Sequence, residues 1–261
     1  MDINLKGKNA LVCGSSKGIG KASALELALL GANVTLVSRS AEKMAAIIGQ
    51  LDDSKDQQHD FLVADFTDSA DLSKKVRGLV ALKPIHILVN NTGGPPAGPI
   101  LNADPKEFVQ AFHNHIICSH ILTKQVVEGM KAAAYGRIIN VISTSVKEPI
   151  AGLGVSNTTR GAMGNWAKTM AGELGGFGIT VNNVLPGYTA TERLTEIIHN
   201  RAKASDTTPD AVQQKMRSTV PAGRFADAHE VGGVVAFLAT PAAGYVNGIN
   251  VPVDGGRTRS L

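Results

Sequence analysis

Short, largely hydrophobic runs alternate along the chain with longer segments in which hydrophobic residues recur every three to four positions. The short runs have the length and β-branched composition of buried strands, and the longer segments have the period of amphipathic helices. The predicted strands are Asn9–Cys13, Asn33–Ser38, Asp60–Ala64, His86–Val89, Arg137–Ile142, Thr180–Leu185 and Ile249–Val253. The predicted helices are Gly18–Leu30, Ala41–Leu51, Asp68–Leu82, Asp104–Lys131, Gly154–Leu174 and Ala228–Leu238.

Strands that alternate with helices imply right-handed crossover connections. Such connections lay the strands parallel in one sheet and place helices over both of its faces. We therefore predict an α/β fold built on a doubly wound parallel sheet of about seven strands. Neither a break in the alternation nor an internal repeat marks a second domain, so residues 1–261 are expected to form a single domain.

One segment, Tyr188–Arg224, departs from this alternation. It is polar and shows only weak helical patterns, near Glu192–Arg201 and Pro209–Ser218. A long excursion directly after a strand of an open α/β sheet is more often a cover over a binding site than a linker. We therefore expect a substrate lid at about residues 188–224.

The composition agrees with a large globular domain. Hydrophobic residues make up 43% of the 261 positions and charged residues 18%, which suits an extensive core and argues against disorder. Cys13 and Cys118 lie in apolar stretches. We expect two buried free thiols in a reducing compartment, and hence a cytoplasmic protein.

Membrane and nucleic-acid functions are disfavoured. The N-terminal stretch has no long apolar run before its first lysines, so no targeting signal is expected. No run approaches the roughly 18 consecutive apolar residues of a membrane-spanning helix. The net charge is +4, but the basic clusters at Lys74–Arg77 and Arg257–Arg259 lack interleaved aromatic residues. They are expected to be solvated faces rather than nucleic-acid contacts.

A glycine-rich loop, CGSSKGIG, runs from Cys13 to Gly20 between the first strand and the first helix. Gly14 allows a sharp turn, Gly18 lets backbone N–H groups approach a pyrophosphate, and Gly20 permits close packing of helix on strand. The helix N-terminus adds a favourable field for an anion. Three glycines alone also occur in purely structural turns. Their placement in the first βαβ unit predicts a single-domain Rossmann fold that binds a dinucleotide.

The end of the second strand indicates which dinucleotide binds. Sites for NAD usually place Asp or Glu there to accept hydrogen bonds from the ribose hydroxyls. Here the strand is followed by Arg39, which cannot accept those bonds but can pair with a 2′-phosphate. Lys17 in the glycine loop adds a second positive charge. Either residue alone is read as a surface cation, but together they favour NADP(H) over NAD(H).

Further motifs follow in order along the chain. Asp65 follows the third strand, the NNTG motif (Asn90–Gly93) follows the fourth, and RIINVIS (Arg137–Ser143) includes the fifth. Pro186-Gly187 follows the sixth strand, and VDGG (Val253–Gly256) the last. By these motifs the chain resembles the short-chain dehydrogenase/reductase family over essentially its whole length, and in particular 3-oxoacyl-carrier-protein reductase-like proteins.

The resemblance implies a role for each matched residue. Asp65 is expected at the adenine amino group, Asn114 and Ser143 in a catalytic tetrad, and Thr189 and Thr191 in the loop that holds the nicotinamide carboxamide. No metal is expected. The cofactor-binding positions implied by the resemblance are Gly14, Ser16, Lys17, Gly18, Ile19, Gly20, Arg39, Asp65, Phe66, Asn91, Gly93, Arg160, Pro186, Gly187, Thr189 and Thr191.

The family pattern changes at its tyrosine and lysine. The resemblance places a Tyr-x-x-x-Lys motif on the helix after the fifth strand, but here the two positions are Ser156 and Arg160. A phenol has a pKa near 10, whereas a serine hydroxyl is a much weaker acid and ends about 4 Å short of where the phenol would reach. Arg160 has five donors for ribose hydroxyls but does not readily release a proton. The predicted catalytic set is therefore Asn114, Ser143, Ser156 and Arg160, with its proton-transfer half altered.

Several groups are candidates for the missing proton donor. Tyr188 follows Pro186-Gly187, although an aromatic side chain that packs within the lid is the simpler interpretation. His113 and His115 flank Asn114 at about 100° on either side of the helix, so they are expected at the surface or an interface. A water molecule held by Ser143, Ser156 and Asn114 is a third candidate. The turn from Gly93 to Pro99 should stiffen one wall of the substrate pocket.

Two functions therefore remain open. The first is an NADP(H)-dependent oxidoreductase that acts on a small carbonyl or alcohol substrate with altered acid catalysis. The second is a non-catalytic dinucleotide-binding sensor or scaffold. The resemblance also implies a homotetramer that pairs through the long helices after the fourth and fifth strands. The second of these helices carries small residues that would allow close approach, unless they pack on the protein's own sheet: Ala162, Gly164, Ala167, Ala171 and Gly172.

Overall fold

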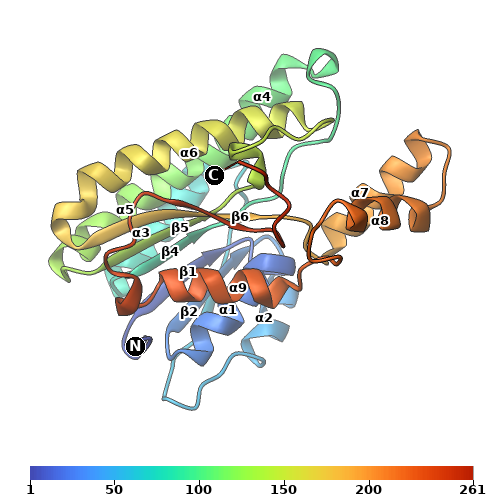
Figure 1. Cartoon of the computed structure of the whole chain (residues 1–261). Helices are drawn as coiled ribbons and strands as arrows, with labels where there is room; N and C mark the ends of the chain where they lie inside the picture. Colours follow the sequence, from blue (N-terminus) through green and yellow to red (C-terminus); the bar gives the residue numbers. More distant parts are fainter. Residues whose placement is uncertain (261) are drawn as a thin grey trace.

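The computed structural model describes residues 1–260 and contains one seven-stranded parallel sheet (Figure 1). The strand order is β3-β2-β1-β4-β5-β6-β7, which confirms the predicted doubly wound Rossmann fold. The strands are β1 (Asn9–Cys13), β2 (Asn33–Ser38), β3 (Asp60–Val63), β4 (Ile87–Asn90), β5 (Gly136–Val141), β6 (Ile179–Pro186) and β7 (Asn250–Val253). Each agrees with its sequence prediction to within one residue at either end.

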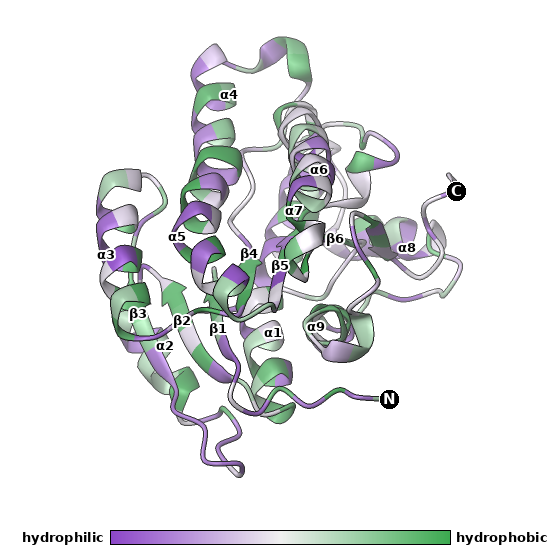
Figure 2. Cartoon of the chain, turned by 90° about the vertical axis from the view of Figure 1, so that its left-hand side faces the viewer, coloured by the Kyte–Doolittle hydropathy of each residue, from purple (hydrophilic) through white to green (hydrophobic). Residues whose placement is uncertain are grey.

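Helices cover both faces of the sheet (Figures 1 and 2). The face of α1, α2 and α9 lies opposite the face of α3, α5 and α6. The α-helices are α1 (Gly18–Leu29), α2 (Ala41–Ile48), α3 (Ser69–Leu82), α4 (Pro105–Phe112), α5 (Cys118–Ala132), α6 (Gly154–Leu174), α7 (Glu192–Ala204), α8 (Pro209–Ser218) and α9 (Ala228–Leu238).

The core consists of two apolar layers, one on each side of the sheet. Successive side chains of a strand point to opposite faces, so Ala10 and Val12 of β1 join the layer under α1 and α9, whereas Leu11 and Cys13 join the layer under α3 and α5. Both faces are covered, which explains why β1, β4 and β5 are hydrophobic runs rather than alternating patterns. Cys13 and Cys118 are free and buried, as expected.

The helix predicted from Asp104 to Lys131 is not regular. A π-helical turn, His113–Ile117, joins α4 to α5. Such a turn inserts an extra residue and rotates the following side chains relative to an ideal α-helix. The expectation that His115 is a surface residue is therefore wrong, because its side chain is 4% exposed. His113 is half-buried and its Nε2 lies 3.1 Å from Ser69 Oγ.

The segment predicted as a lid forms the helix pair α7 and α8, which stands apart from the rest of the domain beyond the end of β6 (Figure 1). Both weak helical patterns of the sequence are confirmed as helices. Thr191 and Thr208 cap their N-termini, with each hydroxyl accepting a backbone N–H of the first turn. Leu194, Ile198 and Met216 hold the pair together in a small apolar cluster of its own.

The small residues of α6 mostly face inward. Ala167 and Ala171 are buried in the core, and Gly164 is buried against Val146, where a Cβ would lie 3.0 Å from the Val146 Cγ1. Their use as a close-approach interface is therefore a wrong interpretation. The alternative of packing on the protein's own sheet is confirmed for Ala167 and Ala171, whereas Gly164 packs on the short helix Thr144–Val146. Gly172 is exposed. Within residues 1–260, no helix has both the length and the apolar character needed to cross a membrane.

Candidate cofactor and reaction site

The chain leaves the neighbouring strands β1 and β4 in opposite directions across the sheet, since β2 and β3 lie on one side and β5 to β7 on the other. In open α/β sheets, ligands bind beyond the carboxyl ends of the strands at such a switch point. The glycine loop follows β1, and the Asn91–Gly93 segment follows β4. The fold thus brings both predicted cofactor segments to the same edge of the sheet.

The glycine loop depends on an approach that only glycine allows. Gly14 has a φ of 60°, and a Cβ there would lie 2.5 Å from the backbone oxygen of Asn91. Asn91 Nδ2 donates to the carbonyl oxygens of Cys13 and Gly14, each at 3.3 Å. A Cβ at Gly20 would likewise collide with the Gly14 carbonyl. Asn91 therefore braces the loop beneath the predicted pyrophosphate position.

Ser15 is a loop residue that the sequence analysis did not single out. Its hydroxyl accepts from the Val37 backbone N–H at 2.9 Å and donates to the Val37 carbonyl at 3.3 Å. The side chain is fully buried. Ser15 thereby fastens the glycine loop to the end of β2. Its place next to Gly14 in a loop of small residues gave no sign of this long-range contact.

The loops after β2 and β3 carry the residues expected near the adenosine half of a dinucleotide. Arg39 is exposed directly after β2. Asp65 Oδ1 accepts from the Thr67 backbone N–H at 3.0 Å. This bond, with a smaller contribution from the charge of Arg39, lowers the pKa of Asp65 and keeps it ionised. The carbonyl of Phe66 accepts from Cys118 Sγ, so Phe66 also fixes the β3 loop to α5.

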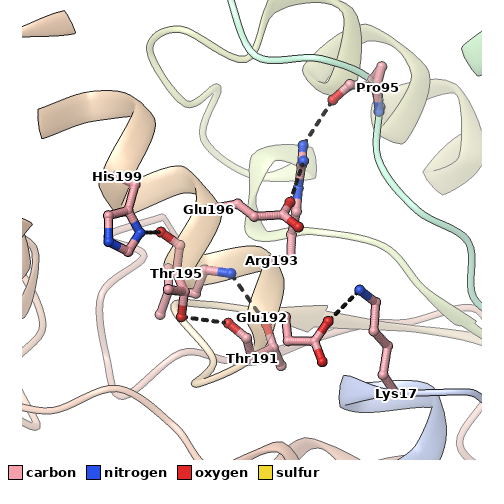
Figure 3. A network of polar contacts seen from close by, with 9 residues as sticks. Lys17, Pro95, Thr191, Glu192, Arg193, Thr195, Glu196 and His199 are labelled. Carbon is pink, nitrogen blue, oxygen red and sulfur yellow. Dashed lines mark hydrogen bonds and ion pairs between the residues drawn. The ribbon is translucent and has the colours of Figure 1, made fainter. Parts of the chain in front are cut away.

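The first turn of α7 contacts both the glycine loop after β1 and the loop after β4 (Figure 3). Glu192 Oε2 lies 2.5 Å from Lys17 Nζ in the glycine loop. The next residue, Arg193, donates through Nη2 to the Pro95 carbonyl at 3.1 Å. A Cβ at Gly18 would lie 3.3 Å from Cγ2 of Thr191. The start of α7 therefore lies directly over the N-terminus of α1.

The predicted reaction residues come from three elements that pack together. Ser143 ends the β5 loop and caps the short helix Thr144–Val146, with Oγ accepting from the Ser145 backbone N–H at 3.1 Å. Ser156 lies in the first turn of α6, which contacts both that short helix and the π-helical turn of Asn114. Asn114 Oδ1 accepts from Gln110 Nε2 at 2.8 Å. Across residues 1–260, no hydrogen bond links the Asn114, Ser143 and Ser156 side chains to one another.

Arg160 is a buried cation. Its side chain lies one turn after Ser156, and the residue is 8% exposed. Nη1 donates to the Val141 carbonyl at 3.0 Å, and no carboxylate of residues 1–260 forms an ion pair with the guanidinium. Desolvation lowers the pKa of Arg160 to about 10, so the group remains charged at neutral pH. An uncompensated buried charge is costly, which marks this position as one held for a purpose other than stability.

His115 lies beside Arg160 rather than at the surface. Its Nδ1 is 2.5 Å from the Thr92 hydroxyl, and both residues border the same small cavity as Arg160. Burial, followed by the charge of Arg160, lowers the pKa of His115 to about 2. The imidazole is therefore neutral and does not act as an acid at physiological pH. No sequence pattern distinguished it from a surface histidine, because its burial follows from the π-helical turn.

Tyr188 packs against the apolar cluster of α7 and α8, in agreement with the simpler interpretation of this residue. Its ring contacts Phe225 edge-on with centroids 5.9 Å apart, and the guanidinium of Arg257 lies 4.5 Å from its centroid. On the same loop, Gly187 N–H donates to the Val253 carbonyl at 2.9 Å and ties the end of β6 to β7, while Thr189 is buried. Within residues 1–260, no group of three or more His, Cys, Asp or Glu side chains is arranged to hold a metal ion.

Comparison with known proteins agrees with this geometry. The family model described as enoyl-(acyl carrier protein) reductase matches residues 14–258. The 3-oxoacyl-[acyl-carrier-protein] reductase of Pseudomonas aeruginosa is 32% identical over 257 residues, which cover 97% of this chain and 98% of that protein. The NADPH-dependent reductase BacG of Bacillus subtilis is 27% identical over 258 residues, covering 97% of this chain and 99% of that one.

A solved structure shows the same fold over the full length. The L-sorbose reductase of Gluconobacter frateurii, crystallised with NADPH and L-sorbose, superposes with a TM-score of 0.92, at 27% identity and with all of both chains covered. The strand order, the glycine loop at the switch point and the match over residues 14–258 all agree. The chain belongs to the short-chain dehydrogenase/reductase family.

Proposed function

We propose that the protein is an NADP(H)-dependent oxidoreductase that interconverts a small carbonyl compound and its alcohol. Its family supports the reaction type, and the cations Arg39 and Lys17 support the phosphorylated cofactor. The observation that carries the cofactor choice is the loop after β2, where an exposed Arg39 stands in the place that NAD sites give to an acid.

The dinucleotide fits the residues at the switch point. Gly14 lets the loop turn closely against Asn91, where any Cβ would collide with the Asn91 carbonyl, and the N-terminus of α1 favours an anion. Lys17 and Arg39 would hold the 2′-phosphate, Asp65 the adenine, and Thr189 and Thr191 the nicotinamide end. When bound, NADPH supplies the hydride that adds to the carbonyl carbon.

This chain's own residues must then orient the substrate oxygen and manage its proton. Ser143, whose hydroxyl caps the short helix that follows it, would donate a hydrogen bond to the oxygen. Arg160 would bind the ribose hydroxyls and stabilise negative charge that develops nearby. The proton would come from a water molecule held by Ser143, Ser156 and Asn114, because His115 is neutral and the Tyr188 ring packs in the lid.

The short side chain of Ser156 beside the cation of Arg160 also favours a substrate with a polar or anionic group. Serine leaves the volume that a phenol would occupy, and a buried guanidinium without a carboxylate partner attracts an anion. A non-catalytic sensor is the second candidate, and the replacement at position 156 is the observation in its favour. A screen of carbonyls and alcohols with NADPH and NADP⁺, run beside a direct cofactor titration, separates the two. Turnover supports the enzyme, and binding without turnover supports the sensor.

We also propose a homotetramer, as the family resemblance implies. Exposed apolar side chains on the α4–α5 side agree with an interface there: Val109 is 71% exposed and Ile117 39%. The inward-facing alanines of α6 no longer contribute to this inference. Sedimentation velocity at micromolar concentration should show a species of four chains, and a monomer would refute the proposal.

A further inference from the structure

Four asparagines form a hydrogen-bonded ladder across the sheet. Asn90, Asn140, Asn183 and Asn250 are in register on the neighbouring strands β4, β5, β6 and β7. Asn90 Nδ2 donates to Asn140 Oδ1 at 2.9 Å, Asn140 Nδ2 to Asn183 Oδ1 at 2.9 Å, and Asn183 Nδ2 to Asn250 Oδ1 at 2.8 Å. All three bonds run in the same sense, so the amide dipoles add.

The ladder begins at a buried oxygen without a partner. Asn90 is 3% exposed, and its Oδ1 has no hydrogen-bond partner in the part of the chain that the structure describes. An amide that donates becomes a stronger acceptor, and chains of hydrogen bonds polarise one another in this way. Asn90 Oδ1 is therefore a strengthened acceptor left unpaired in the interior, where an unmade hydrogen bond costs about 1–3 kcal/mol.

A complementary donor borders the same space. The Nε–H of Arg160 is likewise buried and unpaired within residues 1–260. Asn90 and Arg160 both line a cavity of about 10 Å³, together with Thr92 and His115. A cavity of this size has room for the centre of one water molecule, and a buried water needs at least two polar partners.

We propose that this cavity is an internal water site, in which one water accepts from Arg160 Nε and donates to Asn90 Oδ1 at the end of the asparagine ladder. The ladder then supplies the negative electrostatic potential that a carboxylate would supply in an ordinary ion pair. Its aligned dipoles turn their negative end toward the buried guanidinium, and no formal charge is added. The neutral imidazole of His115 on the same cavity adds no second positive charge.

This arrangement gives each nitrogen of the Arg160 guanidinium a distinct role. Nη1 is held by the Val141 carbonyl and Nε by the water, which leaves Nη2 as the free edge. Nη2 points toward the Gly93–Gly94 segment, at 4.0 Å from where a Cβ on Gly94 would lie. Asn90 is thus a positioning residue that orients Arg160. The consequence for ribose binding rests on the proposed function, whereas the water site itself does not.

Nuclear magnetic resonance of the intact protein tests the water site directly. The Nε–H signal of Arg160, assigned by its loss in Arg160→Lys, should exchange slowly with solvent and show a cross-peak to a long-lived water. In Asn90→Leu, which keeps a similar volume but removes the acceptor, the cross-peak should vanish and exchange should quicken at least about fivefold. Retention of slow exchange in a folded Asn90→Leu, or a wild type without the water cross-peak, overturns the proposal.

A second variant keeps the proposal testable if Asn90→Leu does not fold. Asn250 lies exposed on β7, so Asn250→Ala should be tolerated. The polarised ladder requires that the side-chain amide signals of Asn183, Asn140 and Asn90 all shift in this variant, by decreasing amounts. A shift confined to Asn183 contradicts the ladder.

Cofactor titration of the same variants separates this proposal from the proposed function. Asn90→Leu should weaken NADPH binding by about fivefold, and Asn90→Asp, which retains an acceptor, should bind at least as well as Asn90→Leu. If the wild type binds no dinucleotide, the proposed function fails while the Nε–H measurement still decides the water site. If NADPH binds and Asn90→Leu leaves its affinity unchanged, the positioning role fails.

Discussion

Two of the cations at the candidate site, Lys17 and Arg160, are held in opposite ways. Lys17 is exposed and pairs with the carboxylate of Glu192 in the first turn of α7. Arg160 is buried, pairs with no carboxylate among residues 1–260, donates to the Val141 carbonyl and borders a small cavity. An exposed ion pair exchanges its partner at little cost, whereas a buried guanidinium without a carboxylate partner has only neutral groups to hold it. The first arrangement suits a residue that receives a ligand's phosphate, and the second suits one that orients a reacting group.

The largest expected effect comes from restoring tyrosine and lysine at positions 156 and 160, in the buried part of the site around Arg160. Ser156→Tyr combined with Arg160→Lys restores a phenol beside a lysine, yet we expect it to lower turnover of the native substrate by about 10²-fold. The phenol would fill the space that Ser156 leaves. Steady-state rates with the substrate found in the screen provide the measurement. A gain of reductase activity on simple ketones, with cofactor affinity unchanged, would show instead that the site is an ordinary one weakened by the loss of its tyrosine.

Changes at the exposed cations, Arg39 and Lys17, should alter only the affinity for the cofactor. Arg39→Asp removes a charged partner of the 2′-phosphate and adds a repulsive one, which should weaken NADPH binding by about 1.5–3 kcal/mol, or roughly 10- to 150-fold. Binding of NADH should hold or improve. Isothermal titration with both cofactors measures the change. Lys43→Asp, on the nearby helix α2, serves as a matched charge control and should have a much smaller effect.

The buried half should also control how stability depends on pH. The folded-state pKa of His115 is about 2, against an ordinary value of 6.5, so its contribution to stability is complete above pH 6.5 and is lost as the pH falls below it. The free energy of unfolding should fall by about 1.4 kcal/mol per pH unit from this residue, before most carboxylates titrate. Urea unfolding of wild type and His115→Gln between about pH 5 and 7 isolates the contribution of His115 to the free energy of unfolding, since His86 is common to both. Parallel pH profiles would contradict the burial of His115.

The smallest expected effect is at the lid contact. Glu192→Gln frees Lys17 for the 2′-phosphate, so NADPH affinity should rise, by no more than about fivefold. NADH affinity should not change, because that cofactor carries no 2′-phosphate. Glu196→Gln removes the same charge one turn along α7 and serves as the control (Figure 3). An equal gain for both cofactors would mean that Glu192 acts through lid opening rather than through Lys17.

The sequence predicted the fold well because the fold depends on local signals. The glycine loop and the hydrophobic strands are determined by neighbouring residues, and each lies where it was expected. The strands stand out in the sequence as short hydrophobic runs because both faces of the sheet are covered.

The reaction half was harder to predict because its features are not local. The π-helical turn at His113–Ile117 rotates His115 into the interior, and no residue type signals such a turn. The asparagine ladder joins four strands that are far apart in the sequence and exists only once the sheet has its register. For the same reason the alanines of α6 were misread, since a stripe of small residues looks the same whether it faces a partner or the sheet.

The cofactor assignment is tested most directly by one titration. Dissociation constants of NADPH and NADH, measured on the same preparation of the wild type, should differ by about tenfold or more in favour of NADPH, since Arg39 and Lys17 offer two cations to one phosphate. Equal constants would contradict the assignment and would show that neither cation receives the 2′-phosphate.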